Sequence, residues 1–341
     1  MKTAIVTGVT GQDGSYLSEL LLGKGYRVFG LDRRKADASK SNISHLLDRD
    51  GFTVLNADLL EGSRLMSIVK LICPDEVYHL ASQSFVQTSW DVPIYTCDVN
   101  ALGTVRLLEA IRIFSPGSRF YNASSSEIFG KVNGGSSQHE LTYHYPRSPY
   151  GCSKSFAHNI TRNYRESYSM FCCNGICFNH ESERRGLEFV TRKITNTIAN
   201  IVHGNVDKVV LGNLDVMRDW GYAGDYVEAM YMMLQHSVPD DYVVSSNESH
   251  SVREFVEVAF EIVGIDIEWQ GKGLGEKGVD RRSGKVLVEI SNEFFRPADV
   301  EMLYGDSSKI RKVLGWMPKV SFRQLVERMV THDLKQVGGE N

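Results

Sequence analysis

The feature that most constrains the fold is a glycine-rich turn near the N-terminus, Gly8-Val9-Thr10-Gly11-Gln12-Asp13-Gly14. It stands between a short apolar run, Ala4–Thr7, and a segment with apolar residues at helical spacing, Tyr16–Lys24. Glycines at a strand–turn–helix junction let the backbone approach a pyrophosphate, whose charge then lies at the helix N-terminus. The alternative is a tight turn without any ligand. We predict a dinucleotide here, contacted by Gly8, Thr10, Gly11, Gln12, Asp13 and Gly14.

Short apolar runs alternate with longer helical patterns over residues 1–180. Strands that alternate with helices indicate an α/β fold, a Rossmann-type doubly wound parallel sheet with helices on both faces. We assign residues 1–180 to such a dinucleotide-binding domain. The predicted strands are Ala4–Thr7, Tyr26–Leu31, Phe52–Asn56, Glu76–Leu80, Ser118–Ala123 and Phe171–Phe178, and the helices are Tyr16–Lys24, Ser63–Ile72, Val99–Phe114 and Tyr150–Tyr168.

The pattern becomes irregular in residues 181–341. We expect this part to form a smaller, mixed C-terminal lobe that binds substrate over the strand ends, where open α/β sheets bind ligands. Whether some of its segments return to the first domain stays open. Helices are predicted at Leu187–Val202, Tyr222–His236, Val252–Val263 and Ser321–Leu334, and the glycine-rich stretch 271–278 predicts an exposed loop.

Composition excludes several classes of protein. The chain has 341 residues and a formal net charge of −4, whereas a nucleic-acid binder is usually basic. No apolar run approaches the roughly 18 residues that span a bilayer, and the first apolar stretch is too short for a signal peptide. The six cysteines form no C-x-x-C pair and the ten histidines show no paired ligand spacing, so we expect no metal site. We expect a cytoplasmic protein.

The end of the second predicted strand carries conflicting charges, Asp32-Arg33-Arg34. An acidic residue here favours the ribose hydroxyls of NAD, whereas arginines suit the 2′-phosphate of NADP. The arginines could also be a solvated pair or a subunit contact. We predict Arg33 and Arg34 as cofactor residues and favour NADP, partly on the resemblance described below. Further residues along the same crevice, unless they form ordinary strand-end turns, are Asp58, Leu59, Leu80 and Ala81.

Tyr150 and Lys154 share one face of a predicted helix, because they stand at positions i and i+4. A phenol with a pKa near 10 is a poor base at neutral pH, and a nearby ammonium group lowers that pKa. Lys154 can also hold a nicotinamide ribose. A surface pair is the alternative, but the pair follows Ser124-Ser125-Ser126-Glu127 by one strand–helix unit. With the glycine turn, this arrangement resembles the extended short-chain dehydrogenase/reductase superfamily.

Glu127 narrows the chemistry. Alcohol oxidation or 4-epimerisation needs a Tyr, a Lys and a hydroxyl, but no carboxylate at this position. Once C4 of a hexose is a ketone, the C5 proton is acidic and a base can remove it, and loss of the C6 hydroxyl needs a proton donor. Glu127 could do both with a hydrogen bond from Ser125, or it could be a structural carboxylate of the following turn. An intact Glu127 favours a dehydratase over an epimerase or a ketoreductase.

Longer segments resemble the GDP-mannose 4,6-dehydratase family over nearly the whole chain. The Asn-His-Glu-Ser and Arg-Asp-Trp-Gly blocks are more specific than the superfamily motifs. The matching segments are Thr7–Leu17, Tyr145–Gly151, Phe178–Ser182, Arg185-Gly186, Phe189–Thr195, Arg218–Gly221 and Phe295–Pro297.

The resemblance implies a lyase with tightly bound NADP that is recycled in each turnover, acting on GDP-D-mannose to give GDP-4-keto-6-deoxy-D-mannose. Tyr150 would deprotonate the C4 hydroxyl as hydride leaves C4, Glu127 would take the C5 proton, and hydride would return to C6 after water leaves. Ser125 stands where the family usually has Thr. The family also implies a homodimer or homotetramer and a set of GDP-sugar residues, here Ser84, Asn179, Lys193, Arg218 and Arg296.

Two alternatives stay open. A 4,6-dehydratase of another GDP-sugar, such as a GDP-manno-heptose, would use the same mechanism with different contacts around C5 and C6. A non-catalytic NADP-binding protein would need neither Glu127 nor Tyr150. We expect a GDP-sugar as the partner of this chain, with no nucleic acid and no membrane.

Overall fold

A seven-stranded sheet with the strand order β11-β6-β5-β4-β1-β2-β3 forms the centre of the molecule. The computed structural model describes residues 1–33, 41–131, 137–294 and 302–339. Every neighbouring pair in this sheet is parallel, which confirms the predicted Rossmann-type architecture. The strands are β1 (Thr3–Thr7), β2 (Arg27–Asp32), β3 (Phe52–Asn56), β4 (Glu76–His79), β5 (Arg119–Ser125), β6 (Cys172–Cys177) and β11 (Asp241–Val244).

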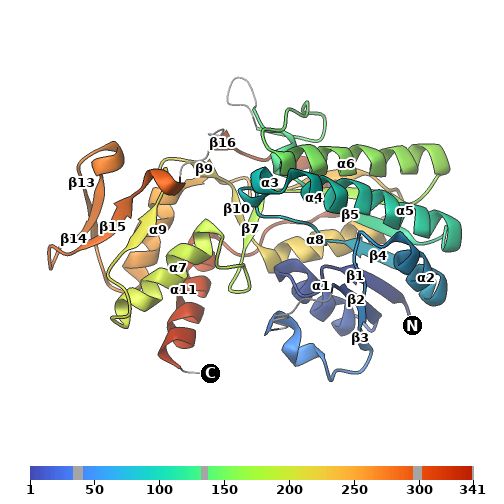
Figure 1. Cartoon of the computed structure of the whole chain (residues 1–341), viewed down its shortest axis with the longest axis horizontal. Coiled ribbons are helices and arrows are strands. Elements are labelled where there is room, and N and C mark those ends of the chain that lie inside the picture. Colours follow the sequence, from blue (N-terminus) through green and yellow to red (C-terminus); the bar gives the residue numbers. More distant parts are fainter. Residues whose placement is uncertain (34–40, 132–136, 295–301, 340–341) are drawn as a thin grey trace.

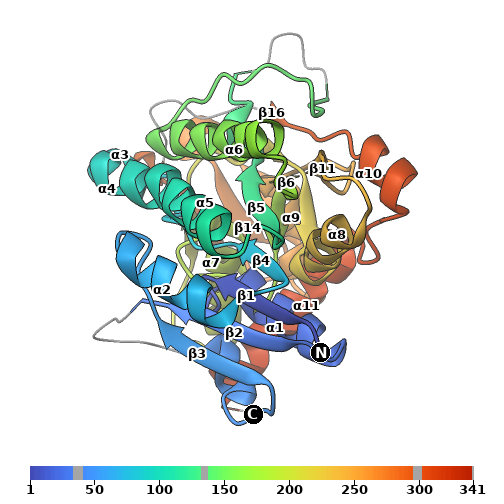
Figure 2. The ribbon, with the colours of Figure 1, turned by 90° about the vertical axis from the view of Figure 1, so that its right-hand side faces the viewer.

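Helices cover both faces of this sheet (Figure 2). The helices α1 (Gln12–Gly23) and α8 (Ala223–Gln235) lie on one face, and α2 (Gly62–Ile72), α5 (Gly103–Phe114) and α6 (Pro149–Tyr168) lie on the other. Side chains of β1 alternate between the two cores: Ala4 and Val6 join the core of α1 and α8, whereas Ile5 joins the core of α2 and α5. Because both faces are covered, buried apolar side chains line both faces of the central strands, with a few buried polar side chains among them.

Helix α6 begins with two local signals. Pro149 occupies its first position, and the Ser148 hydroxyl accepts a hydrogen bond from the Gly151 backbone N–H at 3.0 Å. Proline at this position and serine just before it both favour a helix start. This start fixes which face of α6 carries Tyr150 and Lys154.

The C-terminal lobe has its own core and lies at the far end of the molecule from the N-terminus (Figure 1). Its mixed sheet has the order β13-β14-β15-β8. Ile198, Phe255 and Met329, from three different helices, pack with the β15 residue Val288. The elements are α7 (Val190–Val202), α9 (Val252–Ile262), α11 (Phe322–Gly338), β8 (Val209–Leu211), β13 (Ile267–Gln270), β14 (Lys277–Asp280) and β15 (Val286–Ile290).

The glycine-rich stretch 271–278 is only partly the predicted loop. It contains a short 3₁₀ turn, Gly273–Gly275, and then enters β14. Gly278 is buried in that strand, where an added Cβ would lie 2.8 Å from the side chain of Val288. This glycine marks a close approach inside a sheet.

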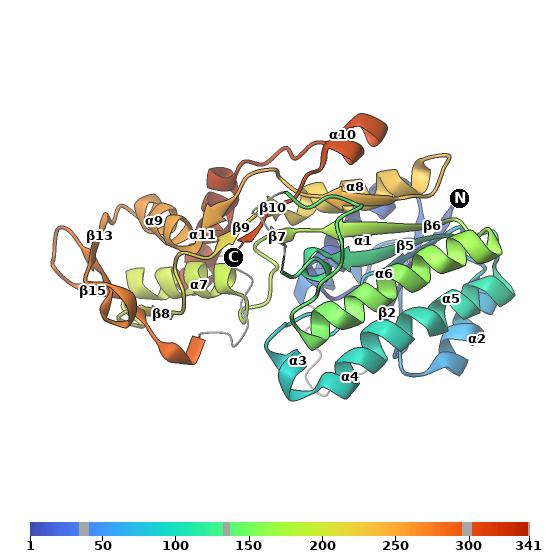
Figure 3. The same ribbon diagram turned by 90° about the horizontal axis from the view of Figure 1, so that it is seen from above.

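The chain crosses between the two parts more than once. After α7 and β8 it forms β9 (Met217–Arg218) and β10 (Trp220–Tyr222), and β10 pairs in parallel with β7 (Asn179–Glu181). It then returns to the large sheet with α8 (Figure 3) and with β11, which pairs with β6. Segments after residue 180 therefore complete the first sheet. No helix of the described ranges is long and apolar enough to cross a membrane.

Candidate active site

A cavity of about 810 Å³ opens at the carboxyl ends of β1, β4 and β5 and extends to the C-terminal lobe. Ligands of open parallel sheets bind at this edge. Arg34 and Arg296 lie outside the described residues, and the structure brings all other predicted site residues to this cavity. They are Gly8, Thr10, Gly11, Gln12, Asp13, Gly14, Arg33, Asp58, Leu59, Leu80, Ala81, Ser84, Ser125, Glu127, Tyr150, Lys154, Asn179, Lys193 and Arg218.

The glycine turn is packed backbone against backbone. Gly8 has φ +70°, and an added Cβ would lie 2.9 Å from the Ala81 Cα. A Cβ on Gly14 would lie 2.3 Å from the Gly8 carbonyl oxygen. Side chains at these two positions would displace the turn, so the glycines bring the first turn of α1 to the cavity with its backbone uncovered. This cradle fits a pyrophosphate.

The side chains of Gln12 and Asp13 join α1 to β7 and the residues after it. The Gln12 amide donates to the His180 carbonyl at 3.0 Å and accepts from the Ser182 hydroxyl at 2.7 Å. Asp13 Oδ2 lies 2.8 Å from His180 Nε2. Burial alone would raise the pKa of Asp13 and lower that of His180, but their mutual attraction reverses both directions. Their mutual attraction therefore favours the charged form of both side chains.

The two charged residues at the end of β2 point to different partners. Asp32 accepts a hydrogen bond from the Thr10 hydroxyl at 3.2 Å, so it braces the glycine turn. The Arg33 guanidinium donates to the Tyr95 hydroxyl and lies 6.0 Å from the centre of that ring. Tyr95, on α4 (Pro93–Cys97), lines the cavity and was not predicted from the sequence. Arg33 thus presents a cation at the edge of the cavity.

Ser125 and Glu127 come from the end of β5, and Tyr150 and Lys154 come from the start of α6. The Glu127 backbone N–H donates to Ser125 Oγ at 3.3 Å. Lys154 Nζ donates to the Ala123 carbonyl at 2.9 Å and lies 5.9 Å from the centre of the Tyr150 ring. The helix and the strand end are therefore joined directly beside the Tyr–Lys pair.

Burial dominates the protonation of this pair. It raises the pKa of Tyr150 to about 12, although a hydrogen bond from Ser125 acts in the opposite direction and the charge of Glu127 adds to the rise. We expected the Lys154 ammonium to lower the pKa of Tyr150, and in this chain burial outweighs any such effect. Burial also lowers the pKa of Lys154 to about 8. The polypeptide alone thus keeps the phenol protonated at neutral pH.

Asn100 fixes the loop after β4 against α6. Its side chain accepts from the Gln83 N–H at 2.8 Å and donates to the Gln83 carbonyl at 3.0 Å and to Ser153 Oγ at 3.1 Å. Asn100 lies in a π-helical turn, Asp98–Leu102, that precedes α5 within the single helix predicted there. Turns of this kind are frequent at functional sites. Apolar spacing does not reveal a one-residue change of helical hydrogen bonding, so the sequence carried no signal for it.

The described geometry agrees with a specific family. A family model for GDP-mannose 4,6 dehydratase matches residues 5–329 of this chain. The chain belongs to the GDP-mannose 4,6-dehydratase family. The expected membership is thus confirmed.

Relatives in this family cover almost the whole chain. A GDP-mannose 4,6 dehydratase of Drosophila melanogaster is 49% identical, over 98% of this chain and 86% of its own length. A GDP-mannose 4,6-dehydratase of Yersinia enterocolitica is 47% identical, over 98% of this chain and 95% of its own length.

Two solved structures with a bound nicotinamide cofactor share the fold. The dTDP-glucose 4,6-dehydratase DesIV from Streptomyces venezuelae, with NAD and TYD bound, has a TM-score of 0.84 at 21% identity and covers 99% of this chain and 98% of its own. RMD from Pseudomonas aeruginosa, complexed with NADPH, has a TM-score of 0.77 at 22% identity and covers 98% of this chain and 100% of its own.

Two basic residues of the GDP-mannose 4,6-dehydratase pattern approach the cavity from the C-terminal side. Lys193 stands in the first turn of α7, and its Nζ lies 3.2 Å from the centre of the Phe294 ring. Burial lowers the pKa of Lys193, and Glu293 opposes this effect. Arg218 is 8% exposed and donates to the Met217 carbonyl at 2.9 Å. These side chains bring positive charge to the side of the cavity opposite the glycine turn.

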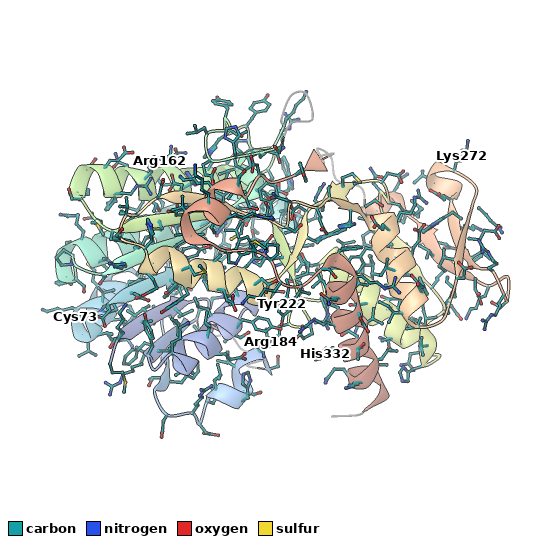
Figure 4. The ribbon with its side chains drawn as sticks, turned by 180° about the vertical axis from the view of Figure 1, so that it is seen from behind. Cys73, Arg162, Arg184, Tyr222, Lys272 and His332 are labelled. Atoms are coloured by element: carbon teal, nitrogen blue, oxygen red, sulfur yellow. The ribbon has the colours of Figure 1, made fainter. Side chains whose placement is uncertain are left out.

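The two adjacent arginines that follow β7, Arg184 and Arg185, contact different parts of the structure. Arg185 lines the cavity, and its guanidinium lies 3.7 Å from the centre of the Phe189 ring. Arg184 turns to α1 instead, where it pairs with Glu19 at 2.6 Å and lies over the Tyr16 ring. Figure 4 shows Arg184 and Tyr222 together at the junction of the large sheet and the C-terminal lobe. Arg184 therefore helps to hold the segment after β7 against α1.

Trp220 both packs in the core of the C-terminal lobe and lines the cavity. Its ring lies 5.4 Å from the Phe255 ring and 6.2 Å from the Phe322 ring.

Across the described part of the chain, no three His, Cys, Asp or Glu side chains are grouped so that they could hold a metal ion.

Proposed function

We propose that this chain is a carbon–oxygen lyase that converts GDP-D-mannose into GDP-4-keto-6-deoxy-D-mannose with a nicotinamide cofactor. The observation that carries the proposal is the presence of Glu127 beside Tyr150 in the cavity of a member of this family. Its charge acts on Tyr150, so a carboxylate base and a phenol base reach one space. Oxidation at C4 needs the phenol base, and the elimination of water that follows needs the carboxylate.

The residues at the end of β5 and the start of α6 divide the work. Tyr150 takes the proton of the C4 hydroxyl, and Lys154 stabilises the phenolate and holds a ribose hydroxyl. Glu127 takes the C5 proton and delivers a proton to the departing C6 hydroxyl, while Ser125 donates a hydrogen bond beside Tyr150. When bound, the cofactor supplies the hydride acceptor for C4 and the hydride donor for C6, so no net oxidation results.

We propose NADP as this cofactor. The uncovered first turn of α1 suits the pyrophosphate, and Arg33 suits a 2′-phosphate because a guanidinium binds phosphate in a bidentate manner. Asp32 is turned to Thr10, so its carboxylate is bound to the glycine turn. The further proposed cofactor contacts are Gly8, Thr10, Gly11, Gln12, Asp13, Gly14, Asp58, Leu59, Leu80 and Ala81.

We place the GDP-sugar between the Tyr–Lys pair and the C-terminal lobe. Lys193 and Arg218 supply the positive charge that a diphosphate needs. Ser84 and Asn179 also line the cavity, and we propose them as sugar contacts. Neither relative described above is named for a heptose substrate, so GDP-mannose is the substrate we propose.

The test is incubation of the purified full chain with GDP-mannose and no added cofactor, followed by mass spectrometry. We expect the substrate to lose one molecule of water, which also shows that cofactor co-purifies. An unchanged substrate mass, with NADP⁺ added as well, would overturn the proposal.

We also propose a homo-oligomer. Several apolar side chains are exposed on α4, α5, α6 and the π-helical turn Asp98–Leu102, among them Ile94, Leu102, Ile113 and Phe156. Exposed apolar groups gathered on neighbouring helices are typical of interfaces between copies. Sedimentation of the full chain should give a dimer or tetramer, and a monomer at micromolar concentration would contradict this.

The cytoplasmic location of this chain stays a prediction.

A further inference from the structure

A row of polar side chains crosses the large sheet beneath α6. Asn122 of β5 stands opposite Asn174 of β6, and Asn174 stands opposite Asp241 of β11. Asn122 Nδ2 donates to Asn174 Oδ1 at 2.8 Å, and Asn174 Nδ2 donates to Asp241 Oδ1 at 2.9 Å. All three side chains are buried. The sheet therefore offers α6 a polar row at this position.

Two arginines of α6 bind the end of this row. Arg162, which Figure 4 labels on α6, donates to Asp241 Oδ2 through Nε at 2.9 Å and through Nη2 at 2.7 Å. Arg165 donates to Asp241 Oδ1 at 2.9 Å. Burial would raise the pKa of Asp241, but hydrogen bonds from Arg165 and the neighbouring positive charges hold it well below its usual range. Asp241 is thus an ionised anchor for α6.

His158 joins the same hydrogen-bond network on the side nearer to Tyr150 and Lys154. It is fully buried and stands one helical turn after Lys154. Its Nδ1 lies 3.1 Å from Ser124 Oγ, and its Nε2 lies 3.3 Å from Arg162 Nη2 and 3.6 Å from Asp241 Oδ2. His144 packs edge-on against its ring at 5.0 Å. His158 thus links α6 to the strand that carries Ser125 and leads into Glu127.

The ring nitrogens of His158 have distinct roles. Burial lowers the pKa of His158 to about 3, although the charge of Asp241 opposes this, so the imidazole is neutral. A guanidinium carries only donors, so Nε2 accepts from Arg162. The proton is then on Nδ1, and Nδ1–H donates to Ser124 Oγ. Arg162, which also binds Asp241, thereby selects the His158 tautomer that donates to Ser124.

We infer that His158 is a positioning residue for the proposed dehydration. Its bond to Ser124 sets the spacing between the end of β5, with Ser125 and Glu127, and the start of α6, with Tyr150 and Lys154. Ser124 directly precedes Ser125, and Lys154 holds the Ala123 carbonyl at 2.9 Å. Two adjacent β5 residues, Ala123 and Ser124, are thus bonded to two successive turns of α6. A small displacement of α6 relative to β5 would move the reacting side chains and lower the reaction rate.

The inference rests on the proposed function, and two replacements of His158 separate its two nitrogens. His158→Asn keeps a donor near the place of Nδ1, so it can still bind Ser124. His158→Gln keeps a polar atom near the place of Nε2 and loses the bond to Ser124. We expect His158→Gln to lower kcat by about tenfold or more with little change in KM, because misplacement affects the transition state most. We expect His158→Asn to recover most of that loss.

Ser124→Ala tests the same bond from the other side with a smaller change. It should lower kcat as His158→Gln does, and the two changes together should cost no more than either alone, as for residues that act as one unit. The matched control is Arg165→Met, which weakens the anchor at Asp241 without touching His158 or Ser124. It should lower the melting temperature and leave kcat unchanged.

A measurement without turnover separates this inference from the proposed function. Ultraviolet difference titration, referenced to Tyr150→Phe, reports the pKa of Tyr150 in the protein as purified. We expect His158→Gln to shift this pKa and His158→Asn to leave it near its native value. Equal shifts or equal kcat losses in both His158 variants would overturn the positioning role, whereas an inactive native chain would overturn only the proposed reaction.

Discussion

Asp13 and His180 lie 167 residues apart in the sequence, and their side chains meet at 2.8 Å. The contact joins the first turn of α1 to β7, so the pyrophosphate cradle is held by the segment that leads into the C-terminal lobe. His180 stacks on Tyr226 at 4.6 Å, which keeps its ring in place.

Replacing His180 with Asn should lower the free energy of unfolding by about 1–3 kcal/mol, because the Asp13 carboxylate loses its charged partner. The raised pKa of His180 contributes stability that is full below its ordinary value of 6.5 and is lost as pH rises through the folded pKa. The lowered pKa of Asp13 contributes stability above 3.8 that is lost as pH falls. Denaturant unfolding at several pH values should show the largest difference from the native chain between these limits. A difference that grows above pH 7 would contradict the pairing.

Gly14→Ala should disrupt the cradle, since its Cβ would lie 2.3 Å from the Gly8 carbonyl oxygen. Backbone cannot yield as a flexible side chain can, so we expect a stability loss of about 1–3 kcal/mol and loss of co-purifying cofactor. Gly23→Ala on the same helix is the matched control, because nothing lies within 4 Å of its added Cβ. It should stabilise the chain slightly. Absorbance of released cofactor and thermal unfolding report both effects.

Glu127→Gln should abolish the loss of water from GDP-mannose while the protein still binds cofactor and sugar nucleotide. The amide preserves the shape of the side chain but cannot take the C5 proton. Mass spectrometry follows the product, and calorimetry follows binding. Glu166→Gln, on an exposed position of α6, removes the same charge away from the cavity and should leave turnover intact. Unchanged formation of the 4-keto product by Glu127→Gln would contradict the role of Glu127.

Arg33→Ala should weaken binding of NADP by about tenfold to a hundredfold, the usual effect of losing a charged hydrogen bond to phosphate. Binding of NAD, which has no 2′-phosphate, should change little. Fluorescence titration of the cofactor-free protein with each dinucleotide measures both. Arg27→Ala, at an exposed position of β2, controls for loss of a positive charge. Equal weakening for both cofactors would show that Arg33 acts without reading the phosphate.

Six strands of the large sheet could be predicted to within two residues at each end because each contains a short apolar run and alternates with a helical pattern. The seventh, β11, was missed. Its run Tyr242-Val243-Val244 is short and follows Asp240 and Asp241, and only pairing with β6 makes it a strand. The strands β13 and β15 were missed for a related reason, since they are short and partly exposed.

The site was predictable where chemistry follows fixed spacing in the sequence. The glycine turn and the pair Tyr150 and Lys154 depend on neighbours a few residues apart, so they could be identified. Asn100 and Tyr95 acquire their contacts from elements far away in the chain, and no local pattern marks them. His180 lies in the Phe178–Ser182 block of the family resemblance, but its contact with Asp13 depends on the fold. The expectation that the pKa of Tyr150 is lowered was wrong for the same reason. The burial that raises this pKa is set by the whole fold.

The late return of the chain to its first sheet has a consequence for how the protein can be divided. A fragment that stopped at residue 180 would leave the edge of β6 unpaired and the apolar face of α1 without α8, an invitation to aggregate. Synthesis of the N-terminal half on the ribosome therefore yields an unfinished sheet until residue 244 has emerged. The large sheet beside the glycine turn is therefore completed only by segments from both halves of the chain.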